Sequence, residues 1–305
     1  MNSNDIPKAF DAYYFEHCCG RPYARDEKWF LFFESIADKI MSDIQPESVL
    51  DAGCAWGFLV EKLRERRIEA FGIDISPYAI ENVHPDIAQY CAVGSIIEPF
   101  SQLYDLIVCI EVLEHMPKDE AERAVRNICD HTGDVLFSST PFDYKEATHF
   151  NVQPPEFWAE LFARYSFFRD VDFDASFITP WAVRFRRKHD PLTRLVRDYE
   201  RKLFLMAKEN SDLRSLSLEM RDQISQLDQT TKSLYTEQEN MKADRREIDD
   251  KLSAIHKSRG WIILRELKNY ECKSFLPEAA GKKPIGESLI LWRNNNNVFP
   301  VNVIA

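Results

Sequence analysis

Two acidic residues and two glycines are spaced as in a strand–turn–helix unit that binds a nucleoside. Asp51 precedes a turn that holds Gly53 and Gly57, and Asp74 lies 23 residues after Asp51, at the end of the next apolar segment. Gly53 allows a sharp bend and the close approach of a ligand where a Cβ would clash. Asp74 can accept hydrogen bonds from both hydroxyls of a ribose. The pattern predicts a site for a cofactor that contains a nucleoside.

The spacing of the glycines argues against a dinucleotide cofactor. A dinucleotide site needs the spacing GxGxxG, so that the pyrophosphate lies on a helix N-terminus. Here the spacing is Gly53-x-x-x-Gly57, and Asp51 puts negative charge where a pyrophosphate would lie. A cofactor with an ammonium and a sulfonium group suits this site better, and a nicotinamide-dependent oxidoreductase is disfavoured.

The apolar pattern around these residues alternates strands with helices. We expect strands at 48–51, 70–74, 90–93, 104–110 and 135–139, helices at 27–44, 57–66, 77–83, 118–131 and 156–165, and two β-rich pieces at 167–174 and 181–187. Strands that alternate with helices form a doubly wound α/β fold, a parallel sheet whose ligands bind at the carboxyl ends of the strands.

These segments resemble the class I S-adenosylmethionine-dependent methyltransferases. Asp51-Ala-Gly53-Cys-Ala-Trp-Gly57 is similar to their first motif, with Ala55 where many members have a glycine. Asp74 matches their ribose-binding acid, and 104–115 looks like their fourth strand and the loop after it. The likeness covers about residues 10–188. It implies a Rossmann-like, seven-stranded methyltransferase sheet with S-adenosylmethionine as the cofactor.

The resemblance also implies a role for individual residues. The Gly53–Gly57 turn would contact the methionine part of the cofactor, Asp74 the ribose, and Ile75 and Ile96 the adenine. Many members place an acid near the adenine where this chain has Gly94-Ser95-Ile96, so Ser95 is the polar group left for that contact. The predicted cofactor set is Asp51, Gly53, Cys54, Ala55, Gly57, Asp74, Ile75, Ser95, Ile96 and Glu111.

Two histidines are candidate catalytic bases. Because a sulfonium is already a good leaving group, the protein has to position the acceptor and remove one proton. Histidine suits that task near neutral pH. His115 and His149 follow the fourth and fifth strands, so both should open onto the site; we rank His149 first and keep His115 as the alternative.

The same loops allow a metal-dependent alternative. Glu111, Glu114, His115 and His149 together resemble the divalent-metal set of small-RNA 2′-O-methyltransferases, and these ligand types suit Mn²⁺ or Mg²⁺. However, Glu-x-x-Glu-His after the fourth strand also occurs in metal-free members. Residues 1–190 hold 19 Lys and Arg against 33 Asp and Glu, whereas nucleic acids are bound through clustered cations. We expect neither a metal nor a nucleic-acid partner.

A region with a different pattern begins near residue 191. There is no proline between Pro191 and Pro277 and no glycine between Gly133 and Gly260. Apolar residues recur at every seventh position, at Leu192, Tyr199, Met206, Leu213, Met220, Leu227, Leu234, Met241, Ile248 and Ile255. The companion position four residues later is mixed and includes Asn210. We predict a coiled coil, preferably a parallel homodimer.

The resulting domain prediction has three parts: a methyltransferase domain over 1–190, a coiled coil over 191–258, and a short amphipathic segment with a disordered tail over 259–305. The segment Ser258–Leu267, built around Trp261, could lie on a membrane surface, dock on a membrane enzyme or fold back on the coil. The chain has no apolar run long enough to cross a bilayer, no signal-peptide pattern and no CxxC motif. We expect a cytoplasmic protein with reduced thiols, and peripheral contact with the inner membrane is the alternative that this segment leaves open.

The combination of a methyltransferase domain and a long coil resembles enzymes that modify bacterial surface polysaccharides. This looser resemblance makes a hydroxyl of a sugar or glycan the leading acceptor, ahead of a small-molecule or lipid-precursor hydroxyl. The alternative from another functional class is a coiled-coil scaffold whose head binds the cofactor without transferring a methyl group.

Overall fold

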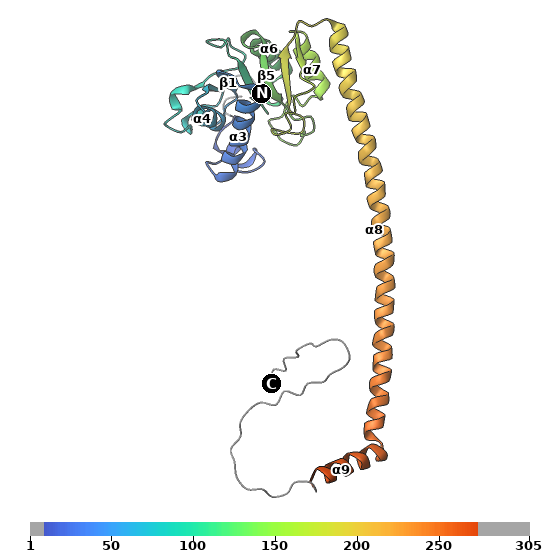
Figure 1. Ribbon diagram of the computed structural model, residues 1–305. Coiled ribbons are helices and arrows are strands. Elements are labelled where there is room, and N and C mark those ends of the chain that lie inside the picture. The colour runs from blue at the N-terminus through green and yellow to red at the C-terminus, as the bar shows by residue number, and fades with distance from the viewer. Residues whose placement is uncertain (1–8, 274–305) are drawn as a thin grey trace. The chain divides into compact units, whose positions relative to one another are not determined.

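The structure, a computed structural model, describes residues 9–273, with side chains over 9–267 (Figure 1). Its head holds a seven-stranded sheet in the order β3-β2-β1-β4-β5-β7-β6. The strands are β1 (Ser48–Ala52), β2 (Glu69–Asp74), β3 (Cys91–Val93), β4 (Leu106–Ile110), β5 (Asp134–Ser138), β6 (Phe167–Arg169) and β7 (Val183–Arg187). The first five pair in parallel, and β7 is antiparallel to both β5 and β6. The predicted Rossmann-like methyltransferase sheet is confirmed.

Helices lie between the strands, as the apolar pattern predicts. They are α2 (Ala12–His17), α3 (Glu27–Lys39), the π-helical η1 (Ile40–Ile44), α4 (Phe58–Glu65), α5 (Pro77–Glu81), the 3₁₀ turns η2 (Ala88–Tyr90) and η3 (Leu113–His115), α6 (Lys118–His131) and α7 (Pro155–Ala163). Side-chain caps start several of them: Asp26 accepts a hydrogen bond from the Trp29 N–H at 2.9 Å, and Ser76 accepts one from Ala79 at 3.0 Å. The α2 helix has no counterpart among the predicted elements.

Apolar side chains bury both faces of the sheet. Leu50, Ile107 and Val135 point to a core shared with α6 and α7, and their neighbours Val49 and Leu106 point to a core shared with α3 and α4. Successive residues of a strand face opposite sides, so a parallel sheet covered on both sides reads as a continuous apolar run. That is why β4 is visible in the sequence as Leu-Ile-Val-Cys-Ile.

The strand order places the site. The chain runs from β1 outward to β3 and then returns to the other side of β1 with β4. Where the connections of two adjacent parallel strands lead to opposite sides of the sheet, a crevice forms beyond the carboxyl ends of those strands. Gly53 follows β1, Asp74 ends β2 and Glu111 follows β4, so the register brings all three to that crevice.

Two helices follow the sheet. α8 (Leu192–Lys257) has 66 residues, about 100 Å of helix at 1.5 Å per residue, and α9 is Arg259–Lys273. The first compact unit of the chain ends at Leu213 and the second begins at Arg214. Within the first unit, Leu195 of α8 is buried and Arg201 pairs with Asp172 at 2.7 Å, so the start of α8 belongs to the head.

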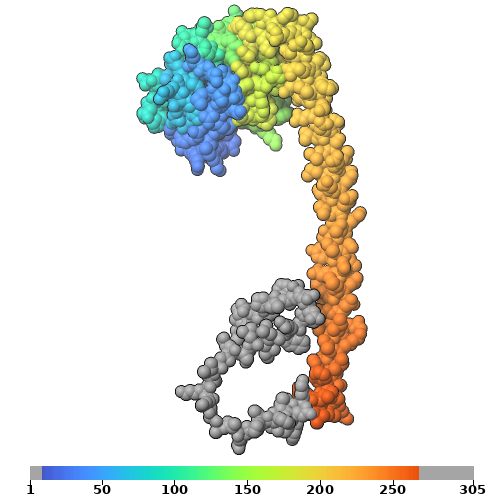
Figure 2. Space-filling view, viewed as in Figure 1, coloured from blue at the N-terminus to red at the C-terminus, as the bar shows by residue number. Residues whose placement is uncertain are grey.

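The predicted continuous helix is confirmed, and its pairing stays a prediction. The heptad residues from Met206 to Ile255 are exposed on α8, which Figure 2 shows as a single long helix. Over the described residues, no helix is both long and apolar enough to cross a bilayer. The predicted disordered tail lies outside the described residues from 274 onward, although α9 shows that the amphipathic segment before it is helical.

Candidate functional site

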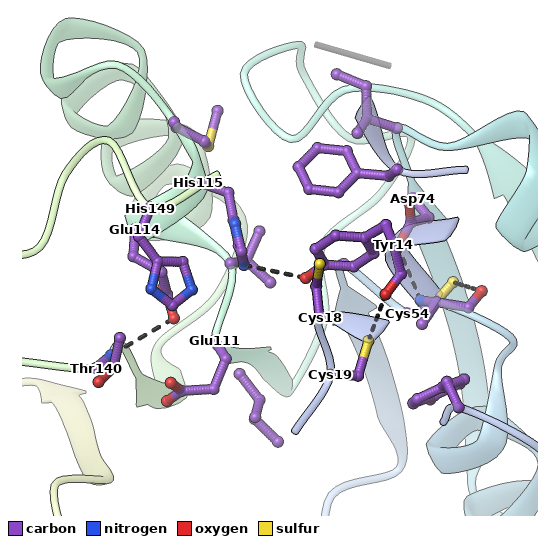
Figure 3. A pocket seen from close by; sticks show the side chains of 18 of the residues that line it. Tyr14, Cys18, Cys19, Cys54, Asp74, Glu111, Glu114, His115, Thr140 and His149 are labelled. Carbon is purple, nitrogen blue, oxygen red and sulfur yellow. Dashed lines mark hydrogen bonds between the residues drawn. The ribbon is translucent and has the colours of Figure 1, made fainter. Parts of the chain in front are cut away.

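A cavity of about 850 Å³ lies at the carboxyl ends of β1, β2 and β4 (Figure 3). Its wall comes from the turn after β1, the end of β2, the loops after β3, β4 and β5, and the N-terminal residues around α2. Small-molecule sites usually measure roughly 300–1,000 Å³, so this one has room for a cofactor together with part of an acceptor. All predicted cofactor and catalytic residues line it except Gly57.

The turn after β1 has the geometry that its glycines suggest. Gly53 has φ +93°, and a Cβ there would lie 2.3 Å from Cγ2 of Val112. Gly57 starts α4 with φ +71°, and it shapes the turn from behind the cavity wall. Ala55 has φ +47° although it carries a Cβ. The turn is therefore fixed in a conformation in which Gly53, Cys54 and Ala55 line the cavity.

Asp74 anchors that turn. Its Oδ2 accepts a hydrogen bond from the Ala55 N–H at 2.8 Å, and its Oδ1 accepts one from the Ser76 N–H at 2.8 Å. Burial raises the pKa of the Asp74 carboxyl group, and these two N–H groups oppose the rise. Each oxygen keeps a lone pair that can face the cavity, which suits the predicted contact with ribose hydroxyls.

Asp51 is a buried carboxyl group, 5% exposed. It lines the cavity, and in the part of the chain that the structure describes no group donates a hydrogen bond to it. Burial, assisted by the nearby Asp74, raises the pKa of Asp51 to about 8. A cation that entered the cavity would stabilise the ionised form, and the ammonium of the predicted cofactor is such a cation.

The expected adenine wall is apolar. Ile75, Ser95 and Ile96 line the cavity together with Gly94. The Ser95 Oγ accepts a weak hydrogen bond of 3.4 Å from the Ile97 N–H. Where many class I methyltransferases have an acid near the adenine, this chain thus has the small hydroxyl side chain of Ser95, which hydrogen-bonds within its own turn.

Glu111 lies at the opposite wall. It has φ +54°, and its Oε1 accepts a hydrogen bond of 2.9 Å from the Trp181 indole N–H. This bond directs the carboxylate of Glu111 toward the segment between β6 and β7. Trp181 lines the cavity as well, and the sequence reading did not single it out.

His115 has partners on both ring nitrogens. The Tyr14 hydroxyl is 3.3 Å from Nε2, and Nδ1 is 2.8 Å from the Thr148 hydroxyl. The Thr148 hydroxyl donates its own hydrogen to Glu146, so it accepts from the Nδ1–H of His115, and Nε2 accepts from Tyr14. Burial and the neighbouring His149 lower the pKa of His115 to about 4. The ring is a neutral, fixed part of the wall.

His149 differs from His115 in the partner of its Nε2, which is a carboxylate and not a hydroxyl. Its Nδ1 is 2.7 Å from the backbone carbonyl of Asp143, and a carbonyl only accepts, so Nδ1 carries the proton. Nε2 lies 3.4 Å from a carboxylate oxygen of Glu146. The arrangement leaves one basic nitrogen with an acid beside it that would stabilise the imidazolium.

Glu114 adds a buried acid to this group. It is fully buried, and burial and Glu111 raise its pKa well above the usual range. One ligand atom from each of Glu114, His115 and His149 lies within 4.8 Å of the others. These three residues are close enough to share a cation, so the metal alternative reduces to this trio, with Glu111 turned toward Trp181.

Several site residues lie outside the sequence motifs. Tyr14 comes from α2, and its side chain lies between Asp74 and His149 in Figure 3. Glu146 lies beside both histidines, at 3.9 Å from His115 Nδ1 and 3.4 Å from His149 Nε2. The Asp11 cap of α2, which accepts from the Tyr13 N–H at 2.9 Å, is a local signal for that helix. Nothing local to Glu146 or Trp181 indicates a site, because the fold of the loop after β5 positions Glu146 and the segment between β6 and β7 positions Trp181.

Residues 23–170 match a family model described as a methyltransferase domain. The strand order, the turn after β1 and this match make that part of the chain similar to class I S-adenosylmethionine-dependent methyltransferase domains. The family uses S-adenosylmethionine as its methyl donor, and the acidic, nucleoside-type cavity fits that cofactor.

Individual relatives share only part of their length with this chain. A ubiquinone biosynthesis O-methyltransferase of Neisseria meningitidis is 32% identical over 123 residues, 36% of this chain and 51% of the relative. The corresponding protein of Acinetobacter baylyi is 28% identical over 113 residues, 33% of this chain and 47% of the relative. The chain thus spans about half the length of the curated relatives it matches.

Solved structures resemble the head more distantly. Magnesium protoporphyrin IX methyltransferase of Synechocystis PCC 6803, solved with bound S-adenosylmethionine, is 16% identical with a TM-score of 0.47, and the match covers 62% of this chain and 100% of that one.

Proposed function

We propose that the protein is an S-adenosylmethionine-dependent O-methyltransferase whose acceptor is a hydroxyl of a sugar or glycan. The observation that supports a transferase best is that His149 lines the same cavity as the predicted cofactor residues. Its Nδ1 is held by the Asp143 carbonyl, and its Nε2 lies beside the Glu146 carboxylate. A head that only bound the cofactor would have no need for such a base.

The residues divide the work between binding and proton transfer. Asp51, Asp74 and the turn around Gly53 hold the cofactor, which when bound supplies an electrophilic methyl group. His149 Nε2 accepts the proton of the acceptor hydroxyl as that oxygen attacks, and Glu146 stabilises the resulting imidazolium. His115, neutral and held by Tyr14 and Thr148, keeps the loops in place without exchanging protons near neutral pH.

A phenolic small molecule is the second candidate acceptor. It is favoured by the similarity to ubiquinone biosynthesis O-methyltransferases, since ubiquinone precursors are phenols. The two candidates differ in what the base must do: a phenol has a pKa near 10 and ionises more readily than a sugar hydroxyl. A strong requirement for His149 therefore favours the sugar.

The exposed heptad stripe of α8 supports a proposed partner, a second copy of this chain. Ten apolar residues at intervals of seven form a seam that a matching helix can cover, and the polar Asn210 would fix the register of a parallel pair. We also propose that α9, whose Trp261 and Leu264 are exposed, contacts a membrane surface or a membrane enzyme at the cytoplasmic side.

The test combines calorimetry with turnover. S-adenosylmethionine should bind the intact chain, and mass spectrometry of the cell-surface glycans should show one methyl group fewer when the protein is absent. His149→Gln should leave binding intact and abolish transfer. Binding of the cofactor without transfer to any glycan or phenol would instead establish the scaffold alternative.

A further inference from the structure

The mouth of the cavity has an aromatic surface that the cofactor does not need. Phe142 and Tyr144 both line the cavity, although they are 75% and 72% exposed. Water-exposed aromatic side chains gathered at a ligand pocket indicate a binding surface. Phe150, on the same loop, lies outside the cavity lining and is 46% exposed.

Trp181 makes this surface a fixed corner. Its ring meets that of Phe142 edge to face, with centroids 6.2 Å apart and an interplanar angle of 84°. The 2.9 Å hydrogen bond from its indole N–H to Glu111 holds the ring in place. Such a corner offers an aromatic face to the C–H side of a saccharide ring, while the Glu111 carboxylate can accept a hydrogen bond from a hydroxyl at the ring edge.

A short backbone segment connects the aromatic residues Phe142 and Tyr144 with the proposed base His149. Phe142 and Tyr144 flank Asp143, whose carbonyl accepts the hydrogen bond from Nδ1 of His149. A ring that stacks on these side chains is therefore bound by the same short segment that orients the base. This connection makes the surface part of the acceptor site.

The charge of the cavity restricts the acceptor further. Among the described lining residues there is one lysine, Lys145, and no arginine, against six carboxyl groups: Asp51, Asp74, Glu111, Glu114, Glu120 and Asp143. Phosphate groups are bound where Arg, Lys or backbone donors cluster. A phosphorylated or nucleotide-linked sugar would bring two or more negative charges to a wall whose described lining has a single Lys or Arg side chain, that of Lys145.

We propose that Phe142, Tyr144 and Trp181 form an acceptor subsite for an uncharged saccharide ring, and that the scarcity of cationic side chains in the described lining excludes sugar phosphates and nucleotide sugars. This inference rests on the proposed function and makes it more specific: methylation acts on a saccharide that no longer carries its activating phosphate. It therefore follows the glycosyl-transfer reactions that consume activated sugars.

Titration of the intact chain, saturated with S-adenosylhomocysteine, tests the subsite. The probes are neutral disaccharides of glucose, mannose and galactose, the 1-phosphates of the same sugars, and catechol, followed by calorimetry and by tryptophan emission. At least one neutral disaccharide should bind tenfold or more tightly than every sugar phosphate. Trp181→Phe should remove the emission change and retain binding of that disaccharide.

Phe142→Ala should weaken disaccharide binding at least tenfold, and the matched control Phe150→Ala should stay within about twofold of wild type. Both side chains are largely exposed, so neither change should affect folding. Equal losses in the two variants, tighter binding of a sugar phosphate, binding of catechol alone, or no saccharide binding would each overturn the subsite. If S-adenosylhomocysteine itself did not bind, the proposed function would fail and the subsite with it; if it bound normally, only the subsite would be refuted.

Discussion

The charge state of Asp51 predicts how cofactor affinity depends on pH. In the free protein the pKa of this buried carboxyl group is about 8, so the group is protonated at pH 6 to 7. A bound cofactor, whose ammonium needs the carboxylate, must displace that proton. Affinity should therefore rise with pH, by about ninefold from about pH 6 to about pH 7, in proportion to the ionised fraction.

Calorimetry measures this linkage directly. Titrations with S-adenosylmethionine in two buffers of different ionisation enthalpy should show nearly one proton released per cofactor at about pH 6.5. The pH should stay below about 7.5, because an α-amino group has a pKa of about 7.7–8.0. His115, with a pKa of about 4, stays neutral throughout this range.

Asp51→Asn should bind the cofactor more weakly at pH 7 and lose most of the pH dependence, apart from the part that Asp74 contributes. Asp86→Asn is the matched control, because the side chain of Asp86 is 87% exposed, and it should keep the wild-type slope. A flat wild-type profile, or an unchanged slope in Asp51→Asn, would refute the assignment of the ammonium to this carboxyl group.

Three further predictions follow from the same structure. Asp74→Asn should weaken cofactor binding about tenfold or more, measured by calorimetry, because both carboxylate oxygens hold the turn or the ribose; unchanged affinity would remove Asp74 from the site. His149→Gln should abolish methyl transfer with cofactor affinity within about twofold, whereas His115→Gln should keep a measurable rate, and excess EDTA should leave wild-type initial rates unchanged; a rate lost to EDTA and restored by Mn²⁺ would point instead to the metal trio. A chain cut after Leu213 should sediment as a folded monomer and the full chain as a dimer; a dimeric fragment would assign oligomerisation to the head.

The sheet and the cofactor side of the site were predictable because their signals are local. Asp51 and Gly53 lie within one turn, Asp74 ends the next strand, and apolar runs such as 106–110 mark strands buried on both faces. The parallel pairing then follows from the alternation of strands and helices, without knowledge of any distant contact. The widened π turn at the end of α3 changes only the last residues of a helix that the pattern already predicts.

The acceptor side was less predictable because its geometry is nonlocal. The sequence ranks His149 before His115 as the base but does not show the partners that give them different roles. Tyr14 comes from a helix about 100 residues earlier in the chain, and Glu146 reaches His149 through the fold of one loop. Trp181 arrives from the segment between β6 and β7. None of these residues has a spacing that predicts its contact.

The acidic lining of the cavity also bears on how the site empties after each turnover. S-adenosylmethionine carries a net charge of about +1 and S-adenosylhomocysteine about zero, because the sulfonium becomes a thioether when the methyl group leaves. A wall of carboxylates attracts the first more strongly than the second. The acidic residues that attract S-adenosylmethionine therefore bind S-adenosylhomocysteine less strongly. The same electrostatic difference favours both the release of the by-product and the binding of the next cofactor molecule.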